Sequence, residues 1–521
     1  MLLRSLSDTI GSHPLIAPTT TDPFAARHHP HRPSTREPSP HPEDLTHELY
    51  RIIRLSLPLA ATNLCSFGIS VATISFVGHL GQNEYDLAAA ILATSVFNVT
   101  GFSLVQGLNS ALETFCGQAW GAANYPAIGL VLQRALTLNF FLVAFVSLLW
   151  GYGAPSLLLL LGQDPIVAAS ASRFLSLLIP ALFFSSIFEA LKRYLAVQGH
   201  ATASAVVTIT SLSLSFLYNY VLIFTLGLGL VGAALAVDAV QATMALSLLL
   251  YAVYVEHGNV DATTRTWPGW SLSAVFHGPS MMAFIRQAIP SVLMLIAEWW
   301  TFEILVLFSG WLPNPQVSLS VMGVCLNLSA FIWSAVGGIA LACSARISGL
   351  LGSQQPHRAR QSAIIALALG VAVECIAVVG ILLTRQRIGI IFTRQPTIIA
   401  CIASIMPIFV ISLPGDGANC VLQGLLRGSG NQALGSIVNL CSYWLLGLPV
   451  SYYLGHVKGL GVAGLWWGLG ILNIVQGVVM LVVCFGGAVD FEREAVVAAE
   501  RSAALLSTPL IMASEDDVED G

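Results

Sequence analysis

The sequence predicts an all-α polytopic membrane protein, with twelve transmembrane helices in two pseudo-symmetric lobes of six. Three observations predict this class. Of the 521 residues, 55% are hydrophobic and only 9% are charged, whereas soluble domains carry about 25% charged residues. Apolar runs long enough to cross a bilayer, about 20 residues each, recur along the chain. The two halves of the chain also resemble each other at a constant offset.

Polar or Pro/Gly-containing breaks separate the apolar runs. In the first half we expect spans at 54–79, 87–111, 128–152, 167–190, 203–226 and 230–255. In the second half we expect them at 284–310, 317–343, 361–384, 397–424, 433–455 and 462–487. The predicted organisation is a tail (1–50), an N-terminal lobe (51–256), an inter-lobe loop (257–283), a C-terminal lobe (284–488) and a tail (489–521).

The repeat rests on three pairs of matching segments, each 232 residues apart. Pro58 in LSLPLAATN matches Pro290 in QAIPSVLML, and Gly78 matches Gly310. The segment GLGLVG at 227–232 matches GLGVAG at 459–464. Because six is even, both repeats start in the same orientation, about an axis along the membrane normal. Such two-lobed repeats are typical of transporters that work by alternating access.

Both tails are expected to be disordered, because segment 1–48 is rich in Pro, His, Ser and Thr and the C-terminus is acidic. The first segment lacks the hydrophobic stretch of a signal peptide, so the N-terminus is expected to stay untranslocated. With a cytoplasmic N-terminus, the inner connections carry more Arg and Lys than the outer ones, which favours two cytoplasmic termini. The plasma membrane and a vacuolar membrane both fit.

Several function classes are excluded or disfavoured. The net charge of −5 arises in the C-terminal tail, and there is no basic run, so nucleic acid is not an expected partner. The nine cysteines lie in apolar stretches without metal-ligand spacing and are expected to be buried. No Walker motif or hydrolase signature is present. The chain is therefore expected to be a transporter rather than an enzyme, with no cofactor and an ion gradient as its energy source.

Acidic residues inside the predicted spans are the first functional candidates, because ionisable groups are rare and costly within a bilayer. There are seven: Glu113, Glu189, Asp238, Glu298, Glu303, Glu374 and Asp416. Glu298 lies near the middle of the seventh span beside Trp299 and Trp300, whose indoles either hold an organic cation or pack. Glu303 follows five residues later and points about 140° away on a straight helix.

Asp416 lies in ISLPGDGANC, where Pro414, Gly415 and Gly417 are expected to break the tenth helix and free carbonyl groups for an ion. A carboxyl group that only bonds a neighbouring helix is the alternative interpretation for Glu298, Glu303 and Asp416.

The remaining four acids are predicted to have structural roles. Glu113 is expected to form a gate salt bridge with Arg346 or Arg134, and Glu189 to pair locally with Lys192 and Arg193. Asp238 and Glu374 are interpreted as packing or lobe-lining residues.

Several segments resemble signatures of the multidrug and toxic compound extrusion (MATE) transporters, in their eukaryotic branch. They are FVGHLG with LAAA (76–90), ALETFCGQAWGA (111–122), EWWTFEILVLFSGWLPNP (298–315), LLRGSGNQ (425–432) and GLGVAGLWWGL (459–469). The resemblance spans roughly residues 50–488. It implies two six-helix lobes around a V-shaped cavity, and export of organic cations or other xenobiotics in exchange for protons.

The resemblance also implies roles for single residues. Glu298 and Glu303 match the two family glutamates of the seventh helix, and Asp416 lies where family members have an acid in the tenth. Two positions depart from the pattern of some relatives: helix eight offers Asn327 and Ser329 instead of a further glutamate, and helix one has Asn63 instead of an aspartate. The expected substrate cavity involves Trp299, Trp300, Asn63, Gln106, Asn327 and Ser329.

The leading hypothesis is a monomeric proton-coupled antiporter in which Glu298, Glu303 and Asp416 exchange protons for a cation; sodium coupling stays open. One alternative is a flippase for lipids or lipid-linked molecules, which would be expected to line its cavity with basic residues. Another is a receptor or scaffold without transport.

Overall fold

The computed structural model describes residues 42–80, 84–160, 162–258 and 264–506. Eleven helices in these ranges are long and apolar enough to cross a membrane, and a twelfth span is a pair of helices bent by 46°. The expectation of twelve transmembrane helices is thereby confirmed. The helices of the first half are α2 (Pro42–Gly78), α3 (Glu84–Phe97), α4 (Ser103–Gly121), α5 (Tyr125–Leu148), α6 (Ala154–Leu160), α7 (Pro165–Leu177), α8 (Ile179–Val197), α9 (Ala201–Asn219) and α10 (Gly229–Gly258).

The short α11 (Leu272–Val275) precedes the second half. Its helices are α12 (Gly278–Gly310), α13 (Pro315–Gly352), α14 (Pro356–Phe392), α15 (Pro396–Ser429), α16 (Gln432–Leu440), α17 (Leu448–Tyr452), α18 (Gly461–Phe485) and α19 (Phe491–Leu506). Segments of π-helix continue several spans, including η1 (Asn98–Phe102), η3 (Tyr220–Thr225) and η6 (Tyr453–Val457). Pro180 has no N–H to continue α7 into α8, and the free N–H of Ala181 donates to Asp238 Oδ1 at 2.8 Å.

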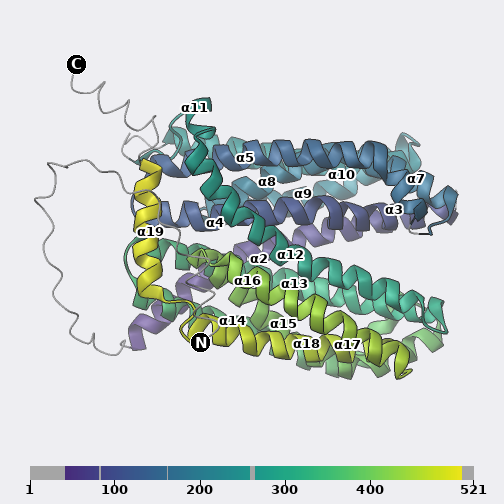
Figure 1. The fold of residues 1–521 in the computed structure, drawn as a ribbon. Coiled ribbons are helices and arrows are strands. Elements are labelled where there is room, and N and C mark those ends of the chain that lie inside the picture. Colours follow the sequence, from purple (N-terminus) through teal and green to yellow (C-terminus); the bar gives the residue numbers. More distant parts are fainter. Residues whose placement is uncertain (1–41, 81–83, 161, 259–263, 507–521) are drawn as a thin grey trace, which may run out of the picture.

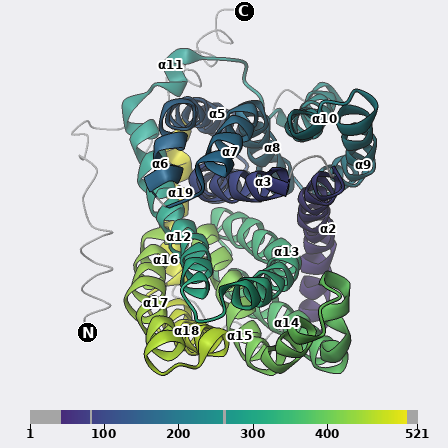
Figure 2. The same ribbon diagram turned by 90° about the vertical axis from the view of Figure 1, so that its right-hand side faces the viewer.

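The helices form two bundles, one from each half of the chain (Figure 1). The bundles lie close together at the end where α19 lies, which we call the terminal side, and they diverge toward the other end. Seen along the bundles, α2 and α12 stand on opposite sides of the boundary between the lobes (Figure 2). Near the terminal side α2 contributes Ile52 to the core of the C-terminal lobe. In the same region α12 contributes Phe284 and Ala288 to the core of the N-terminal lobe.

The internal repeat is visible in the backbone. Gly227 and Gly229 have φ of 65° and 56°, and their counterparts Gly459 and Gly461 have 69° and 60°. These left-handed conformations favour glycine, since other residues strain there. A methyl group on Gly232 would lie 2.5 Å from the Leu222 carbonyl oxygen, and one on Gly464 would lie 2.5 Å from that of Leu454. The same close turn is therefore built twice, 232 residues apart.

The ends of the chain differ from the sequence-based expectation. Helix α2 begins at Pro42, inside the segment assigned to the first tail. Residues 491–506 of the second tail form α19, which buries Phe491, Ala498 and Leu505. The histidine-rich part of the first tail and the acidic end of the second lie outside the described residues. The prediction that all nine cysteines are buried was wrong for four of them: Cys375 and Cys441 are exposed, and Cys65 and Cys401 are only partly buried.

Candidate functional site

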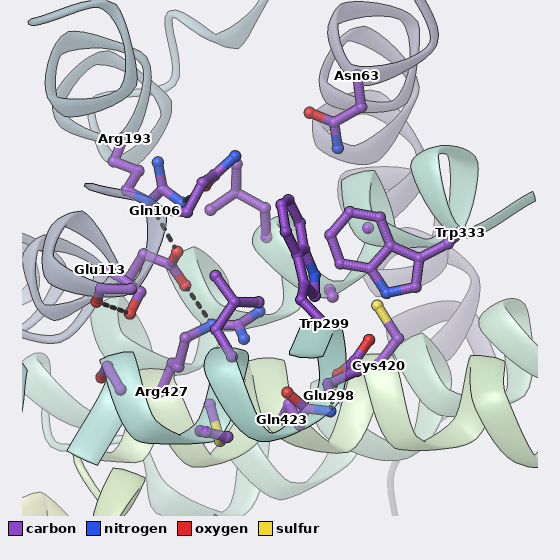
Figure 3. Close-up of a pocket in the computed structure, with 18 of the residues that line it drawn as sticks. Asn63, Gln106, Glu113, Arg193, Glu298, Trp299, Trp333, Cys420, Gln423 and Arg427 are labelled. Carbon is purple, nitrogen blue, oxygen red and sulfur yellow. Dashed lines mark hydrogen bonds and ion pairs between the residues drawn. The ribbon is translucent and has the colours of Figure 1, made fainter. Parts of the chain in front are cut away.

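A cavity of about 80 Å³ lies between the two lobes, lined by residues of both. The N-terminal half contributes Asn63, Gln106, Glu113, Lys192 and Arg193 to its polar lining. The C-terminal half contributes Glu298, Trp299, Trp333, Cys420, Gln423 and Arg427 (Figure 3). We call this space the inter-lobe cavity. Five of the predicted site residues line it: Glu298, Trp299, Asn63, Gln106 and the gate candidate Glu113.

Glu298 is the one predicted coupling acid that lines the cavity. Its side chain is 4% exposed, and Gln423 Nε2 donates to its Oε2 at 3.0 Å. The Trp333 indole and the charge of Arg427 also act on this carboxyl group. Because the group is held by donors from two neighbouring helices, its orientation is fixed while one side stays open to the cavity.

Aromatic rings stand around this acid. The ring centres of Trp299 and Trp333 are 5.9 Å apart, with the planes nearly perpendicular at 79°. Phe102 of η1 lies 6.2 Å from Trp299 and brings the other lobe into the same group. Carboxylate and indole groups together are the partners that organic cations prefer.

The terminal side of the cavity is closed by a network of buried ion pairs. Glu113 Oε1 accepts from Arg193 Nε, and its Oε2 accepts from Arg427 Nε, each at 3.1 Å. Glu113 is on α4 and Arg427 is on α15, so this carboxylate joins the two lobes. Glu189 accepts from Lys192 Nζ at 2.7 Å and from Arg193 Nη1 at 2.5 Å. The local pairing predicted for Glu189 is therefore confirmed.

The charges of this network do not balance. The two acids Glu113 and Glu189 face three bases, Lys192, Arg193 and Arg427. One positive charge is left over, and an ionised Glu298 would balance it. The net charge of the cavity therefore depends on whether Glu298 holds a proton, a cation or neither.

The predicted partners of Glu113 were wrong. Arg346 is instead held by Glu48, through two hydrogen bonds of 2.7 and 2.9 Å. Arg134 donates to the Ala274 carbonyl oxygen at 2.9 Å. Helix α13 does pack against α4 near Gly117 and Gly121, but the Arg346 side chain bonds Glu48 of α2 instead of Glu113. Arg346 thus joins α13 to α2 and lies outside the inter-lobe cavity.

Asp416 is 6% exposed and does not line the cavity. The expected break in its helix was wrong, because α15 runs without interruption from Pro396 to Ser429, with Pro407 and Pro414 inside it. The charges of Asp416 and Glu298 are close enough to act on each other. Asp416 therefore lies behind Glu298, within the C-terminal lobe.

The other predicted residues are dispersed. Glu303 interacts with Ser95 of α3, and Trp300 Nε1 donates to the Val99 carbonyl oxygen at 3.0 Å. Asn327 is exposed and donates to the Gly323 carbonyl within its own helix at 2.8 Å. Ser329 is buried on α13 outside the cavity lining.

Sequence reasoning missed Trp333, Gln423 and Arg427 as residues of the site. Gln423 follows Asp416 by seven residues, which is two helical turns on the same face. That spacing was a usable signal. Arg427 follows Gln423 by four residues and lies on the same side of the helix. In the sequence analysis it was counted only among the basic residues of the inner connections.

Comparison with known proteins agrees with this architecture. The family model MatE matches residues 58–221 and 290–453, once in each half. Protein DETOXIFICATION 17 of Arabidopsis thaliana is 35% identical over 422 residues, which cover 81% of this chain and 86% of the relative. Protein DETOXIFICATION 16 of the same plant is 35% identical over 429 residues, covering 82% and 86%.

Solved structures give the same result. The crystal structure of the eukaryotic MATE transporter AtDTX14 matches with a TM-score of 0.82 and 32% identity, covering 88% of this chain and 99% of that one. An outward-facing multidrug resistance MATE family transporter matches with a TM-score of 0.73 at 18% identity, covering 91% and 100%, which supports the fold alone. The chain therefore belongs to the eukaryotic branch of the MATE family of membrane transporters.

Proposed function

We propose that this transporter exports organic cations in exchange for protons, with Glu298 as the group that holds either one. The observation that carries the proposal is the position of Glu298, a nearly buried carboxyl group at the wall of the inter-lobe cavity beside Trp299 and Trp333. Proton and cation compete for this group. The competition couples their movements, because a ligand shifts the two lobes only by its different affinity for the two states.

The charge count supports the same exchange. A proton on Glu298 and a cation bound to ionised Glu298 leave the surroundings with the same net charge, one positive charge in excess. The cavity of about 80 Å³ is smaller than the roughly 300–1,000 Å³ of sites that enclose drug-sized ligands. It is suited to the cationic head group of such a molecule.

A flippase for lipids is disfavoured, although for a different reason from the one the sequence offered. Basic residues do line the cavity, contrary to the expectation. However, Lys192, Arg193 and Arg427 each donate to a carboxylate of the network, so they are not free to bind a phosphate group.

The orientation and the membrane belong to the same proposal. The start of α2 and helix α19, at the two ends of the described chain, lie at the same end of the bundles (Figure 1). The connections on that side also carry an excess of basic residues, which is typical of cytoplasmic loops. We therefore assign the terminal side to the cytoplasm. The proposed protein is a monomer in the plasma membrane or a vacuolar membrane. Substrate would leave on the opposite side.

The test is uptake of tetraethylammonium into proteoliposomes with an acidic lumen. The native chain is expected to take up the cation only with a pH gradient, and Glu298→Gln is expected to abolish uptake. Asp238→Asn is the matched control, since Asp238 is a half-buried acid of the N-terminal lobe that does not line the cavity. Gradient-driven uptake by folded Glu298→Gln would refute the assignment, and uptake driven by a sodium gradient alone would replace the proton with sodium.

A further inference from the structure

Glu374 is a buried acid that the proposed exchange does not use. It lies within the membrane-spanning helix α14 and is 1% exposed. Neither carboxyl oxygen has a hydrogen-bond partner among the described residues. A glutamate in such a position is unusual, because buried polar groups are nearly always hydrogen-bonded.

The carboxyl group of Glu374 lies against the backbone of α15 at Gly417. A methyl group added to Gly417 would lie 2.2 Å from Glu374 Cγ and 3.0 Å from its Oε1. Glu374 thus occupies the space that a side chain at position 417 would take. Asp416 directly precedes Gly417 on α15. The charges of Asp416 and Glu374 are close enough to act on each other.

Three acids therefore lie in sequence from the cavity into the C-terminal lobe. Glu298 of α12 lines the cavity, Asp416 of α15 interacts with it, and Glu374 of α14 interacts with Asp416. Neither Asp416 nor Glu374 lines the inter-lobe cavity. Asp416 is the member that interacts electrostatically with both of the others.

The elements packed against α14 bring no basic group to this point in the described structure. Helix α15 brings Asp416 and the buried thiol of Cys420 there. The ionisable groups of α2, α13 and α19 meet α14 near its first turns, where Glu48 accepts from Ser362 and bonds Arg346, and Glu492 lies 3.9 Å from His357. Ser362 precedes Glu374 by twelve residues, or about 18 Å along a helix.

An isolated ionised carboxylate is strongly disfavoured in such a place. Two neighbouring carboxyl groups also do not both ionise readily, because their charges repel. The pair formed by Asp416 and Glu374 therefore holds at least one proton in the arrangement of the lobes seen here.

We propose that Asp416 and Glu374 form a second proton-binding site, separate from the substrate site, that takes up and releases a proton in each transport cycle. This inference rests on the proposed function. The proton reaches the cavity through Asp416. One proton exchanged at Glu298 and one at the pair give two protons for each monovalent cation, so each cycle moves one net positive charge with the protons.

The test uses the full chain in acid-loaded proteoliposomes at a fixed pH gradient, with the membrane potential set by potassium and valinomycin. Two protons leave as one tetraethylammonium enters, so an inside-positive potential is expected to accelerate native uptake severalfold. Glu374→Gln keeps the size of the side chain but cannot release a proton. It is expected to retain uptake driven by the pH gradient and to lose the dependence on potential, whereas Asp238→Asn keeps both.

Two results would overturn the inference. The first is native uptake whose rate does not depend on the membrane potential. The second is uptake by Glu374→Gln with the same dependence on potential as the native protein. Glu374 would then be a permanently protonated packing group. Failure of the proposed function would give a distinct result: uptake by the native protein would not depend on the pH gradient.

Infrared difference spectroscopy provides a second measurement in case Glu374→Gln does not fold. With isotope-labelled glutamate, acidification should produce a protonated-glutamate band that persists in Glu298→Gln and disappears in Glu374→Asp. Absence of such a band from the native protein would also overturn the inference.

Discussion

Glu113 Oε2 lies 3.1 Å from Arg427 Nε, and this ion pair joins α4 of one lobe to α15 of the other at the terminal side of the cavity. The contact is reinforced nearby, because Thr114 Oγ1 donates to the Arg427 carbonyl oxygen at 2.5 Å and Gln432 Nε2 donates to Thr114 Oγ1 at 2.7 Å. Arg427 also acts on Glu298. Arg427 therefore joins the two lobes and also interacts electrostatically with Glu298 in the proposed substrate site.

This pair predicts an unequal effect of removing its two members. Glu113→Gln leaves both Arg193 and Arg427 short of a buried partner, a loss worth about 3–5 kcal/mol. Arg427→Gln costs less, because Glu113 keeps Arg193. The apparent melting temperature should fall more for Glu113→Gln than for Arg427→Gln, and the double variant should fall by less than the sum. The exposed Arg358→Gln serves as control, and equal shifts in all three single variants would contradict the role of the pair.

Gly121 permits the close approach of α4 and α13 across the lobe boundary. A methyl group on Gly121 would lie 2.0 Å from the Gly349 carbonyl oxygen, a backbone atom that cannot rotate away. Gly121→Ala should therefore separate the lobes at the terminal side. Spin labels at Gln198 and Arg360 should report longer distances by electron–electron double resonance. Gly380→Ala is the control, since nothing lies within 4 Å of a methyl group at that position. An unchanged distance between the spin labels in Gly121→Ala would show that the close approach at Gly121 does not hold the lobes together.

The repeat and the spans could be read from the sequence because they depend on local patterns. Apolar length fixed the positions of the helices, and matching residues such as Pro58 and Pro290 revealed the duplication. Helix α19 was missed because its apolar residues, among them Phe491 and Leu505, are spread through a charged segment. Its burial depends on surfaces of both lobes that form only after folding.

The candidate site was partly predictable for the same reason. Glu298 stands out because an acid followed directly by two tryptophans in an apolar span is rare. The partners of Glu113 could not be found from sequence, because Arg427 lies more than 300 positions away and meets it only across the lobe boundary. The break expected at Asp416 did not form because packing keeps α15 helical despite Pro414, and prolines are tolerated in membrane helices when neighbours satisfy the backbone.

Asp238 is predicted to stabilise the bend between α7 and α8. Its Oδ1 accepts from the Ala181 N–H, which lies in the first turn of α8 and has no partner inside that helix. Asp238→Ala should destabilise the fold by about 1–3 kcal/mol, the usual effect of an unsatisfied buried donor. Asp238→Asn keeps an acceptor oxygen and should remain near native in apparent melting temperature. If Asn were as damaging as Ala, the charge rather than the hydrogen bond would be the important feature.

Docking of α19 is predicted to depend on pH through Glu494. Residues of this helix contact both lobes, since Asn124 Nδ2 donates to the Ser502 carbonyl at 3.0 Å and Gln354 Nε2 donates to that of Ala495 at 2.5 Å. Burial raises the pKa of Glu494 above its ordinary value, although Arg501 and Asn431 oppose the shift. Because the docked helix binds the proton more tightly than a detached one, docking is strongest below the ordinary pKa of 4.5. It weakens as the pH rises through the raised pKa of the docked state.

Each unit of pKa difference changes the docking equilibrium by up to about tenfold. Hydrogen–deuterium exchange of residues 491–506, corrected for the intrinsic exchange rate, should therefore be slower at about pH 5 than at about pH 8. Glu494→Gln should exchange equally slowly at both values, because it mimics the protonated form. Glu500→Gln, an exposed acid of the same helix, should keep the native dependence. Equal protection of the native helix at both pH values would show that Glu494 stays in one charge state while α19 is docked and while it is detached.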